Sequence, residues 1–340
     1  MPRPSPTTAR HRSWTAAAGA AAAVLCAVAG LAPHAQTPPT NAPRQGSTAL
    51  PQGVAANDHL PPRPWVIAHR GASAYAPENT VPAFERAIAQ RATFVEIDVQ
   101  RTKDGVLVCL HDLTLDRTTD VAARFPGRAR EAQGAAGPRH WLEDFTYDEV
   151  RQLDAGRWFH PDFAGTRVPT FAETMAAVRG RTGLYIELKA PERYPGIERQ
   201  VLQELQAAGL SAPGAEARTP IVVQSFTHES LERFAALESG LPIHLLFSAR
   251  DADTWLSPDG LARARRFATG LSPEKSTFRT HAAQLRAAQE SGLPLTPWTF
   301  RAIHPQMTPA EATAEMVRML AEHQLDGLIT DNPDLAPQTR

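Results

Sequence analysis

The chain has 340 residues, of which 42% are hydrophobic and 21% are charged. Its 35 basic and 36 acidic side chains nearly balance, which excludes a nucleic-acid partner bound through a strongly basic face. Two cysteines are too few for a disulfide framework or for a zinc site made of cysteines. Beyond a short N-terminal segment, the length suits one large α/β barrel domain or two ordinary domains.

The first 35 residues are predicted to be a signal peptide. Residues 1–13 carry three arginines and no acidic residue, and residues 14–32 form an uncharged run rich in alanine. A basic start followed by a short apolar run is typical of an export signal. A retained membrane anchor is the alternative, because about 20 apolar residues can span a bilayer. Alanine is only weakly hydrophobic, so we expect an exported protein that is periplasmic or secreted.

Residues 36–64 are predicted to be a disordered linker, because they are rich in proline, glycine, serine and threonine and show no hydrophobic period. In residues 65–340, short apolar runs alternate with helical patterns, which is typical of a parallel sheet built from βα units. The predicted strands are 65–69, 93–99, 106–110, 183–188, 220–225, 242–247, 268–272, 294–299 and 326–330. The predicted helices are 80–90, 171–179, 196–208, 228–238, 259–266, 279–291 and 308–323.

These nine strands are one more than a (β/α)₈ TIM barrel holds. Only residues 100–105 separate the second strand from the third, whereas a parallel crossover needs about a dozen residues or more. The third strand is therefore predicted to fold back as a hairpin arm, which places His111 across from Glu96 within about two residues. The long segment 112–165 is then an insertion after strand 2, with one short helix, and such insertions usually form a wall or lid over a site.

Catalytic groups of a TIM barrel come from the C-terminal ends of its strands. Glu96 and Asp98 are spaced by two and share a face of one strand, and Glu187 ends the next barrel strand. Three such carboxylates would repel one another unless a hard divalent cation, Ca²⁺ or Mg²⁺, lies between them. The alternative is a layer of salt bridges with Arg70 and Lys189.

Two histidines, His69 and His111, are predicted at strand ends beside these carboxylates. A lone histidine next to an apolar run is more often a core residue. Two that converge on one acidic cluster are suited to act as general acid and base, because histidine titrates near the working pH. Arg70 and Lys189 add positive charge that can bind a phosphate. This combination predicts phosphoryl chemistry.

Several motifs on this rim resemble those of the glycerophosphodiester phosphodiesterase family, over about residues 65–335. They are HRG at 69–71, PENT at 77–80, EID at 96–98, TKDG at 102–105, HD at 111–112, ELK at 187–189, QSF at 224–226, WT at 298–299 and TDNP at 330–333. Residues 115–130 are more similar to the exported bacterial branch of the family, which uses calcium.

The resemblance implies a barrel of the phospholipase-C-like phosphodiesterase type. It implies a divalent metal, Ca²⁺ rather than Mg²⁺, on Glu96, Asp98 and Glu187, and it implies that His69 and His111 form the catalytic pair. The residues implied to contact substrate or to support the site are Arg70, Lys189, Trp298, Glu78, Asn79 and Gln224. For Trp298, a wall against glycerol and core packing are equally compatible with the sequence. Thr80 is expected to cap the next helix.

The implied activity is metal-dependent hydrolysis of glycerophosphodiesters to sn-glycerol 3-phosphate and an alcohol. The first alternative is a lysophospholipase D-like or sphingomyelinase D-like enzyme, which would need an exposed apolar patch at the barrel mouth. The second is a non-catalytic barrel that binds phosphodiesters. The expected partner is a small-molecule glycerophosphodiester, with membrane contact only through an uncleaved signal segment or a lipid-like substrate.

Overall fold

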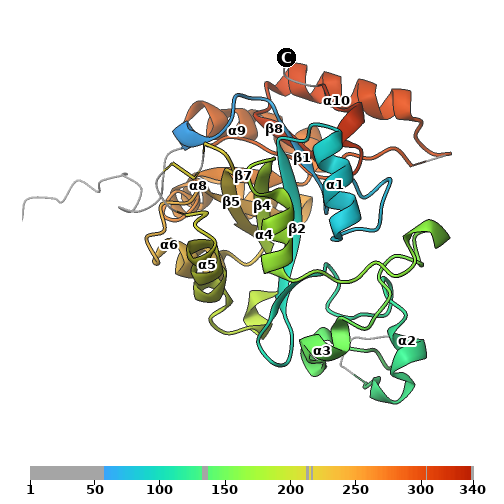
Figure 1. The fold of residues 1–340 in the computed structure, drawn as a ribbon. Coiled ribbons are helices and arrows are strands. Elements are labelled where there is room, and N and C mark those ends of the chain that lie inside the picture. Colours follow the sequence, from blue (N-terminus) through green and yellow to red (C-terminus); the bar gives the residue numbers. More distant parts are fainter. Residues whose placement is uncertain (1–56, 132–136, 212–213, 216, 304, 338–340) are drawn as a thin grey trace, which may run out of the picture. The chain divides into compact units, whose positions relative to one another are not determined.

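The computed structural model describes residues 57–131, 137–211, 214–215, 217–303 and 305–337. The predicted signal peptide and most of the predicted linker lie outside these residues. The strands are β1 (Trp65–Ala68), β2 (Phe94–Arg101), β3 (Leu107–Cys109), β4 (Gly183–Leu188), β5 (Ile221–Ser225), β6 (Ile243–Phe247), β7 (Gly270–Pro273) and β8 (Gly327–Thr330). They form one curved sheet in the order β7-β6-β5-β4-β2-β1-β8, with β3 beside β2 (Figure 1). All pairs on this path are parallel.

The predicted hairpin is confirmed, because β3 runs antiparallel to β2 and Val99 pairs with Cys109. This register differs by one residue from the predicted pairing of His111 with Glu96. The last backbone hydrogen bond of the arm runs from Leu110 N to Asp98 O at 2.9 Å. It places His111, the next residue, at the same end of the barrel as Asp98.

The predicted strand at 294–299 is not a regular strand, because Pro294 and Pro297 lack the N–H groups that a ladder requires. The segment nevertheless lies between β7 and β8. Leu295 bridges to Leu271 of β7, and Phe300 bridges to Thr330 of β8. The carbonyl of Pro297 also accepts a bond of 2.9 Å from Ile329 N. This segment occupies the remaining strand position and closes the sheet, which confirms the TIM-barrel class.

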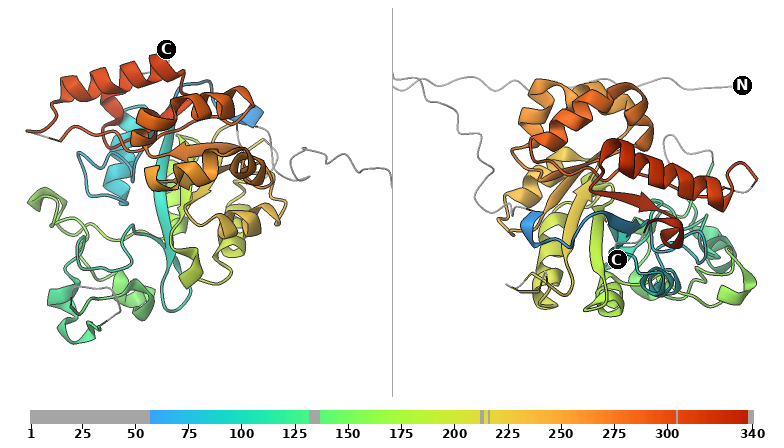
Figure 2. Two further views of the ribbon diagram at one scale, coloured as in Figure 1. Left: turned by 180° about the vertical axis from the view of Figure 1, so that it is seen from behind. Right: turned by 90° about the horizontal axis from the view of Figure 1, so that it is seen from above.

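Apart from α2 and α3, which belong to the insertion, the helices follow the strands and cover the outside of the sheet (Figures 1 and 2). They are α1 (Val81–Ala89), α2 (Val121–Arg124), α3 (Tyr147–Val150), α4 (Phe171–Val178), α5 (Ile197–Ala207), α6 (His228–Ala235), α7 (Ala252–Leu256), α8 (Pro258–Ala264), α9 (Phe278–Glu290) and α10 (Pro309–His323). The seven helices predicted after barrel strands and the short helix predicted in the insertion are present. The short helices α2 and α7 were not predicted. Among the described residues, no helix combines the length and apolar character that a membrane crossing requires.

The barrel interior carries an aromatic layer at one end and carboxylates at the other. Alternation along a strand puts Phe94 and Glu96 on the same face of β2, and Tyr185 and Glu187 on the same face of β4. Trp65, Phe94 and Tyr185 are fully buried in one aromatic cluster. The carboxylates lie two residues further along, so the aromatic layer forms a floor beneath them.

The insertion has a small core of its own within the described residues. It consists of Val108, Leu110, Leu115, Val121, Leu142, Phe145, Val150, Leu153, Ala155 and Val168. Because Val108 belongs to β3, this core joins the insertion to the hairpin arm. The helices α2 and α3 accordingly form a separate group in Figure 1.

Residues 57–64, the end of the predicted linker, pack against the N-terminal ends of the strands. The side-chain amide of Asn57 donates to Thr269 O at 2.8 Å, and the indole of Trp65 donates to Pro61 O at 2.7 Å. Leu60 packs against the aromatic cluster that contains Trp65. The end of the barrel opposite the carboxylates is therefore covered.

We expect Gly71→Ala to destabilise the fold more than Gly105→Ala. Both glycines have positive φ, 81° and 92°, but a Cβ on Gly71 would lie 2.7 Å from the backbone of Ala83 in α1, whereas one on Gly105 would meet nothing within 4 Å. Positive φ alone costs an alanine about 1 kcal/mol, and the clash should add a further 1–3 kcal/mol, roughly. Urea unfolding of the two variants measures the difference, and equal losses of stability would contradict the role of close packing between Gly71 and α1.

Candidate active site

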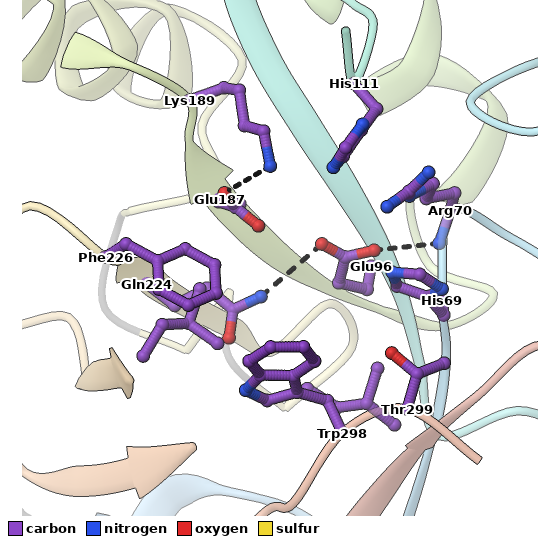
Figure 3. Close-up of a pocket in the computed structure, with 12 residues that line it drawn as sticks. His69, Arg70, Glu96, His111, Glu187, Lys189, Gln224, Phe226, Trp298 and Thr299 are labelled. Atoms are coloured by element: carbon purple, nitrogen blue, oxygen red, sulfur yellow. Dashed lines mark hydrogen bonds and ion pairs between the residues drawn. The ribbon is translucent and has the colours of Figure 1, made fainter. Parts of the chain in front are cut away.

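A pocket of about 220 Å³ opens at the C-terminal ends of the strands (Figure 3). Its polar lining comes from the ends of β1, β2, β4 and β5 and from the hairpin arm. The lining residues are His69, Arg70, Glu96, His111, Glu187, Lys189, Gln224, Phe226, Leu246, Trp298, Thr299 and Ile329. Eight of them were predicted as site residues. The other predicted residues, Asp98, Glu78 and Asn79, lie behind this lining and contact it.

The three predicted metal-binding carboxylates meet in the structure. The parallel register of β2 and β4 pairs Asp98 with Glu187, and Glu96 lies two residues before Asp98 on the same face. One oxygen of each carboxylate lies within 4.8 Å of the others, and all three side chains are buried.

Two of these carboxylates have cationic partners, as the salt-bridge alternative predicted. Lys189 Nζ lies 2.8 Å from Glu187 and 3.4 Å from Asp98, and Arg70 Nε also lies 3.4 Å from Asp98. Asn79 donates its amide to Asp98 at 2.8 Å. Burial would raise the pKa of Asp98, but Lys189 and Arg70 outweigh burial and lower that pKa below its usual range. Asp98 is therefore ionised.

Glu96 has no side-chain cation within ion-pairing distance among the described residues. Its contacts are the backbone N–H of Arg70 at 2.8 Å and the amide of Gln224 at 3.4 Å. Burial and the nearby Asp98 and Glu187 raise the pKa of Glu96 well above its usual value. Burial, together with Asp98, also raises the pKa of Glu187 in spite of Lys189. The arginine and lysine thus leave part of the negative charge uncompensated, and a hard divalent cation with oxygen ligands fits that deficit.

Both predicted histidines are oriented by an aspartate. His69 Nδ1 lies 2.7 Å from Asp331 Oδ1, and His111 Nδ1 lies 2.8 Å from Asp112 Oδ1. A carboxylate at Nδ1 favours a proton on that nitrogen and leaves Nε2 for chemistry in the pocket. The pairing of Ala68 with Thr330 explains why Asp331, which follows β8, reaches His69.

The loop after β1 holds Arg70 in place. Arg70 and Asn79 both have φ of 55°, and Asn79 N donates to Arg70 O at 3.0 Å. Glu78 accepts a bond of 2.9 Å from Arg70 Nη1, so it orients the guanidinium as expected. Thr80 precedes α1 but donates its hydroxyl to Pro77 O at 2.5 Å, so it does not cap the helix with its side chain. The PENT motif therefore orients the side chains of Arg70 and Asp98 through hydrogen bonds.

Aromatic side chains form the opposite wall of the pocket (Figure 3). Phe226 and Trp298 meet edge to face with ring centroids 5.4 Å apart. The Trp298 indole donates to Ser272 O at 2.9 Å, and its ring also packs against the barrel's aromatic cluster. Trp298 therefore lines the pocket and also packs against the core, and a wall against glycerol stays a prediction. Phe226 is 43% exposed at the rim.

Three features of the site were not predicted. The first is the pairing of the histidines with Asp112 and Asp331, for which the polar residues at the end of strand 8 were an available signal. The second is Phe226, which lay within a quoted motif. The third is Arg117 of the insertion, which contacts Glu78 and Asp112 and for which the sequence carried no geometric signal. None of the described residues of 112–165 lines the pocket, so the expectation that the insertion forms a wall or lid stays a prediction.

Comparison with known proteins shows which family the chain belongs to. A model of the "Glycerophosphoryl diester phosphodiesterase family" matches residues 69–335. The chain belongs to this family. A glycerophosphodiester phosphodiesterase of Bacillus subtilis is 31% identical over 299 residues, which cover 84% of this chain and 90% of that protein. Another, from Caldanaerobacter subterraneus, is 33% identical over 79% of this chain and 94% of its own length.

Solved structures of phosphodiesterases share the fold. An Oleispira antarctica phosphodiesterase, solved in complex with the product sn-glycerol-3-phosphate, is 26% identical with a TM-score of 0.61, over 80% of this chain and 94% of that one. A glycerophosphodiester phosphodiesterase from Agrobacterium tumefaciens is also 26% identical, with a TM-score of 0.59, over 80% of this chain and 98% of that one. These likenesses support the barrel fold of the chain.

We expect cation binding to weaken as the pH falls. Because the pKa of Glu96 is raised, this side chain keeps its proton where an ordinary glutamate is ionised, and a bound cation requires the ionised form. If one proton leaves per ion bound, affinity for Ca²⁺ rises about tenfold per pH unit and levels off above the raised pKa. Calorimetric titrations across the pH range measure this slope, and Glu96→Gln should reduce it, leaving the smaller dependence that the raised pKa of Glu187 contributes. A pH-independent affinity in the unaltered protein would contradict the account.

Proposed function

We propose that the protein hydrolyses glycerophosphodiesters to sn-glycerol 3-phosphate and an alcohol in a reaction that depends on a divalent cation. The observation that carries the proposal is the meeting of three buried carboxylates with two aspartate-paired histidines in one small pocket. Family membership supports the reaction class. The product bound to the Oleispira antarctica relative supports glycerol 3-phosphate as one half of the substrate.

Glu96, Asp98 and Glu187 would hold the cation. When bound, it would supply Lewis-acid stabilisation of charge on the phosphoryl oxygens. Ca²⁺ is favoured over Mg²⁺, because Ca²⁺ accepts irregular sets of six to eight oxygen ligands, roughly, whereas Mg²⁺ demands near-octahedral geometry. The resemblance of residues 115–130 to the calcium-using branch supports the same choice.

Arg70 and Lys189 would bind the phosphate. A lysine has three N–H donors and Lys189 contacts two carboxylates, so a donor remains for a phosphate oxygen. Arg70 donates Nη1 to Glu78 and has Nε near Asp98, which leaves Nη2 for the ligand. Both cations therefore neutralise the carboxylates and remain able to bind an anion.

His69 and His111 would transfer the protons. With Nδ1 held by an aspartate, each ring presents Nε2 to the pocket. One histidine would remove the proton from the attacking oxygen, and the other would protonate the leaving alkoxide. The aspartates fix the rings and stabilise the imidazolium that forms after proton uptake.

A lipid-directed phosphodiesterase is the second candidate, and the exposed Phe226 favours it. An exposed aromatic ring at the pocket rim can contact an acyl chain as well as a small alcohol. Activity on lysophosphatidylcholine that exceeds activity on glycerophosphocholine would select this candidate. A non-catalytic barrel would hydrolyse neither.

We also propose that the protein acts after export, in the periplasm or outside the cell. The basic start and the apolar run at 14–32 support a signal segment. Extracellular compartments also hold Ca²⁺ at levels that a site of modest affinity can use.

The direct test measures glycerol 3-phosphate release from several glycerophosphodiesters. We expect the protein treated with a chelator to be inactive, because the proposed cation would stabilise the charge on the phosphoryl oxygens. Ca²⁺ should restore activity at a lower concentration than Mg²⁺. Full activity after complete chelation would contradict metal dependence.

Replacement of either histidine tests the acid and base roles. His69→Ala and His111→Ala should each lower kcat by about 10²- to 10⁴-fold, with much smaller effects on KM, because neither ring is the main phosphate ligand. His160→Ala, which removes an exposed histidine of the insertion, is the matched control. A substrate with a p-nitrophenol leaving group should rescue only the variant that has lost the acid. Turnover within tenfold of the unaltered protein in either site variant would remove that histidine from the mechanism.

A further inference from the structure

Arg117 of the insertion makes an unusually complete set of contacts with two carboxylates. Its Nη1 and Nη2 each donate to Glu78 at 2.8 Å. Its Nε and Nη2 donate to Asp112 at 2.7 and 2.9 Å. All three guanidinium nitrogens are therefore engaged, although the side chain is 43% exposed. A single surface ion pair would contribute little, whereas paired two-point contacts fix both partners in direction.

Each of these carboxylates contacts a residue that lines the pocket. Glu78 accepts from Arg70 Nη1 at 2.9 Å, and Asp112 lies 2.8 Å from His111 Nδ1. Arg70 follows β1 and His111 follows β3, so the two residues come from different parts of the barrel rim. Arg117 contacts both carboxylates, so it links the partner of His111 to the partner of Arg70.

Arg117 favours the ionised forms of Glu78 and Asp112. Burial by itself would raise the pKa of Glu78, but Arg117 and Arg70 outweigh burial and lower it. Burial also opposes ionisation of Asp112, whose pKa is lowered by His111 and Arg117. Without Arg117, two neighbouring carboxylates would repel each other behind the pocket.

The insertion holds Arg117 firmly. Asp116, the preceding residue, accepts bonds from the backbone N–H and from Nδ1 of His140, at 2.9 and 2.8 Å. Leu115 belongs to the core of the insertion. The ring of Trp158 lies 5.9 Å from the Arg117 guanidinium. The insertion, which does not line the pocket, therefore reaches the site through this side chain.

The other histidine has a simpler support. Asp331 holds His69 and lies 3.0 Å from Arg301 Nε, and Arg301 has no described contact with Glu78 or Arg70. Through Asp331, Arg301 therefore supports His69 alone among the two histidines. This difference makes Arg301 a comparison for Arg117.

We propose that Arg117 is a positioning residue. Through Asp112 and Glu78, it fixes the positions of the His111 and Arg70 side chains relative to each other. The inference rests on the proposed function, because it assigns the consequences to a proton-transferring histidine and a phosphate-binding arginine. Arg117 itself need not touch substrate. The insertion thereby contributes to catalysis from behind the pocket.

The test compares Arg117→Gln with Arg301→Gln on glycerophosphocholine. Arg117→Gln should lower kcat and raise KM together, with kcat/KM falling about 10- to 100-fold. The reason is that the carboxylates that orient His111 and the phosphate-binding Arg70 both lose their contacts with Arg117. Arg301→Gln should lower kcat with little change in KM. Arg117→Lys keeps the charge but not the planar fork, so it should remain impaired.

Arg128→Gln controls for general weakening of the insertion. Arg128 pairs with Glu149 and donates to Asp144 O inside the insertion, and contacts no pocket residue. Thermal unfolding of all variants shows whether the fold is retained. Kinetics of Arg117→Gln that match Arg128→Gln, or full activity in Arg117→Lys, would overturn the proposal.

Failure of the proposed function is recognised separately. If the unaltered protein hydrolyses no phosphodiester, the proposed function fails, and crystal structures of the unaltered protein and of Arg117→Gln then decide the positioning role. Displacement of both His111 and Arg70 in the variant would support it. Unchanged side-chain positions of either residue would overturn it.

Discussion

Three carboxylates placed within 4.8 Å of one another in a buried barrel mouth repel, and the surroundings have to offset that repulsion. Arg70 and Lys189 compensate Asp98 and part of the charge on Glu187, whereas Glu96 is left with a raised pKa. The need for charge compensation continues away from the pocket. Glu78 orients Arg70, and Arg117 in turn neutralises Glu78. The polar residues around the pocket thus form a chain of alternating charges that starts at the acidic centre.

The barrel makes this concentration of charge possible by separating it from the core. On β2 and β4 the same inward face carries an aromatic residue first and a carboxylate two residues later. Phe94 and Tyr185 fill the interior below, and Gly183 leaves the space that the Phe94 ring occupies. The energetic cost of the carboxylates therefore falls on a few strand ends, while the remainder of the interior stays closely packed.

Much of this arrangement could be predicted from sequence because it follows from periodicity and loop length. Spacing by two placed Glu96 and Asp98 on one face, and the six-residue connection at 100–105 required the hairpin that delivers His111. The strand at 294–299 could not be predicted correctly, since its apolar residues resemble a strand while Pro294 and Pro297 prevent a regular ladder. Asp331 was within reach of prediction, because the pairing of β1 with β8 places it beside His69. Arg117 was not, because an irregular insertion has no periodicity from which the direction of a side chain follows.

The central claim is that a divalent cation belongs between Glu96, Asp98 and Glu187, and anomalous scattering from a crystal soaked with Mn²⁺ tests it most directly. The account predicts one strong peak in the pocket, with an oxygen of each carboxylate at about 2.0–2.6 Å from the ion. Glu96 should then be ionised and contact the ion, while Arg70 and Lys189 stay at the edge of the cluster. An absence of any peak there, with Lys189 still bridging Glu187 and Asp98 at saturating Mn²⁺, would show that the salt-bridge layer alone neutralises the site and would contradict the account.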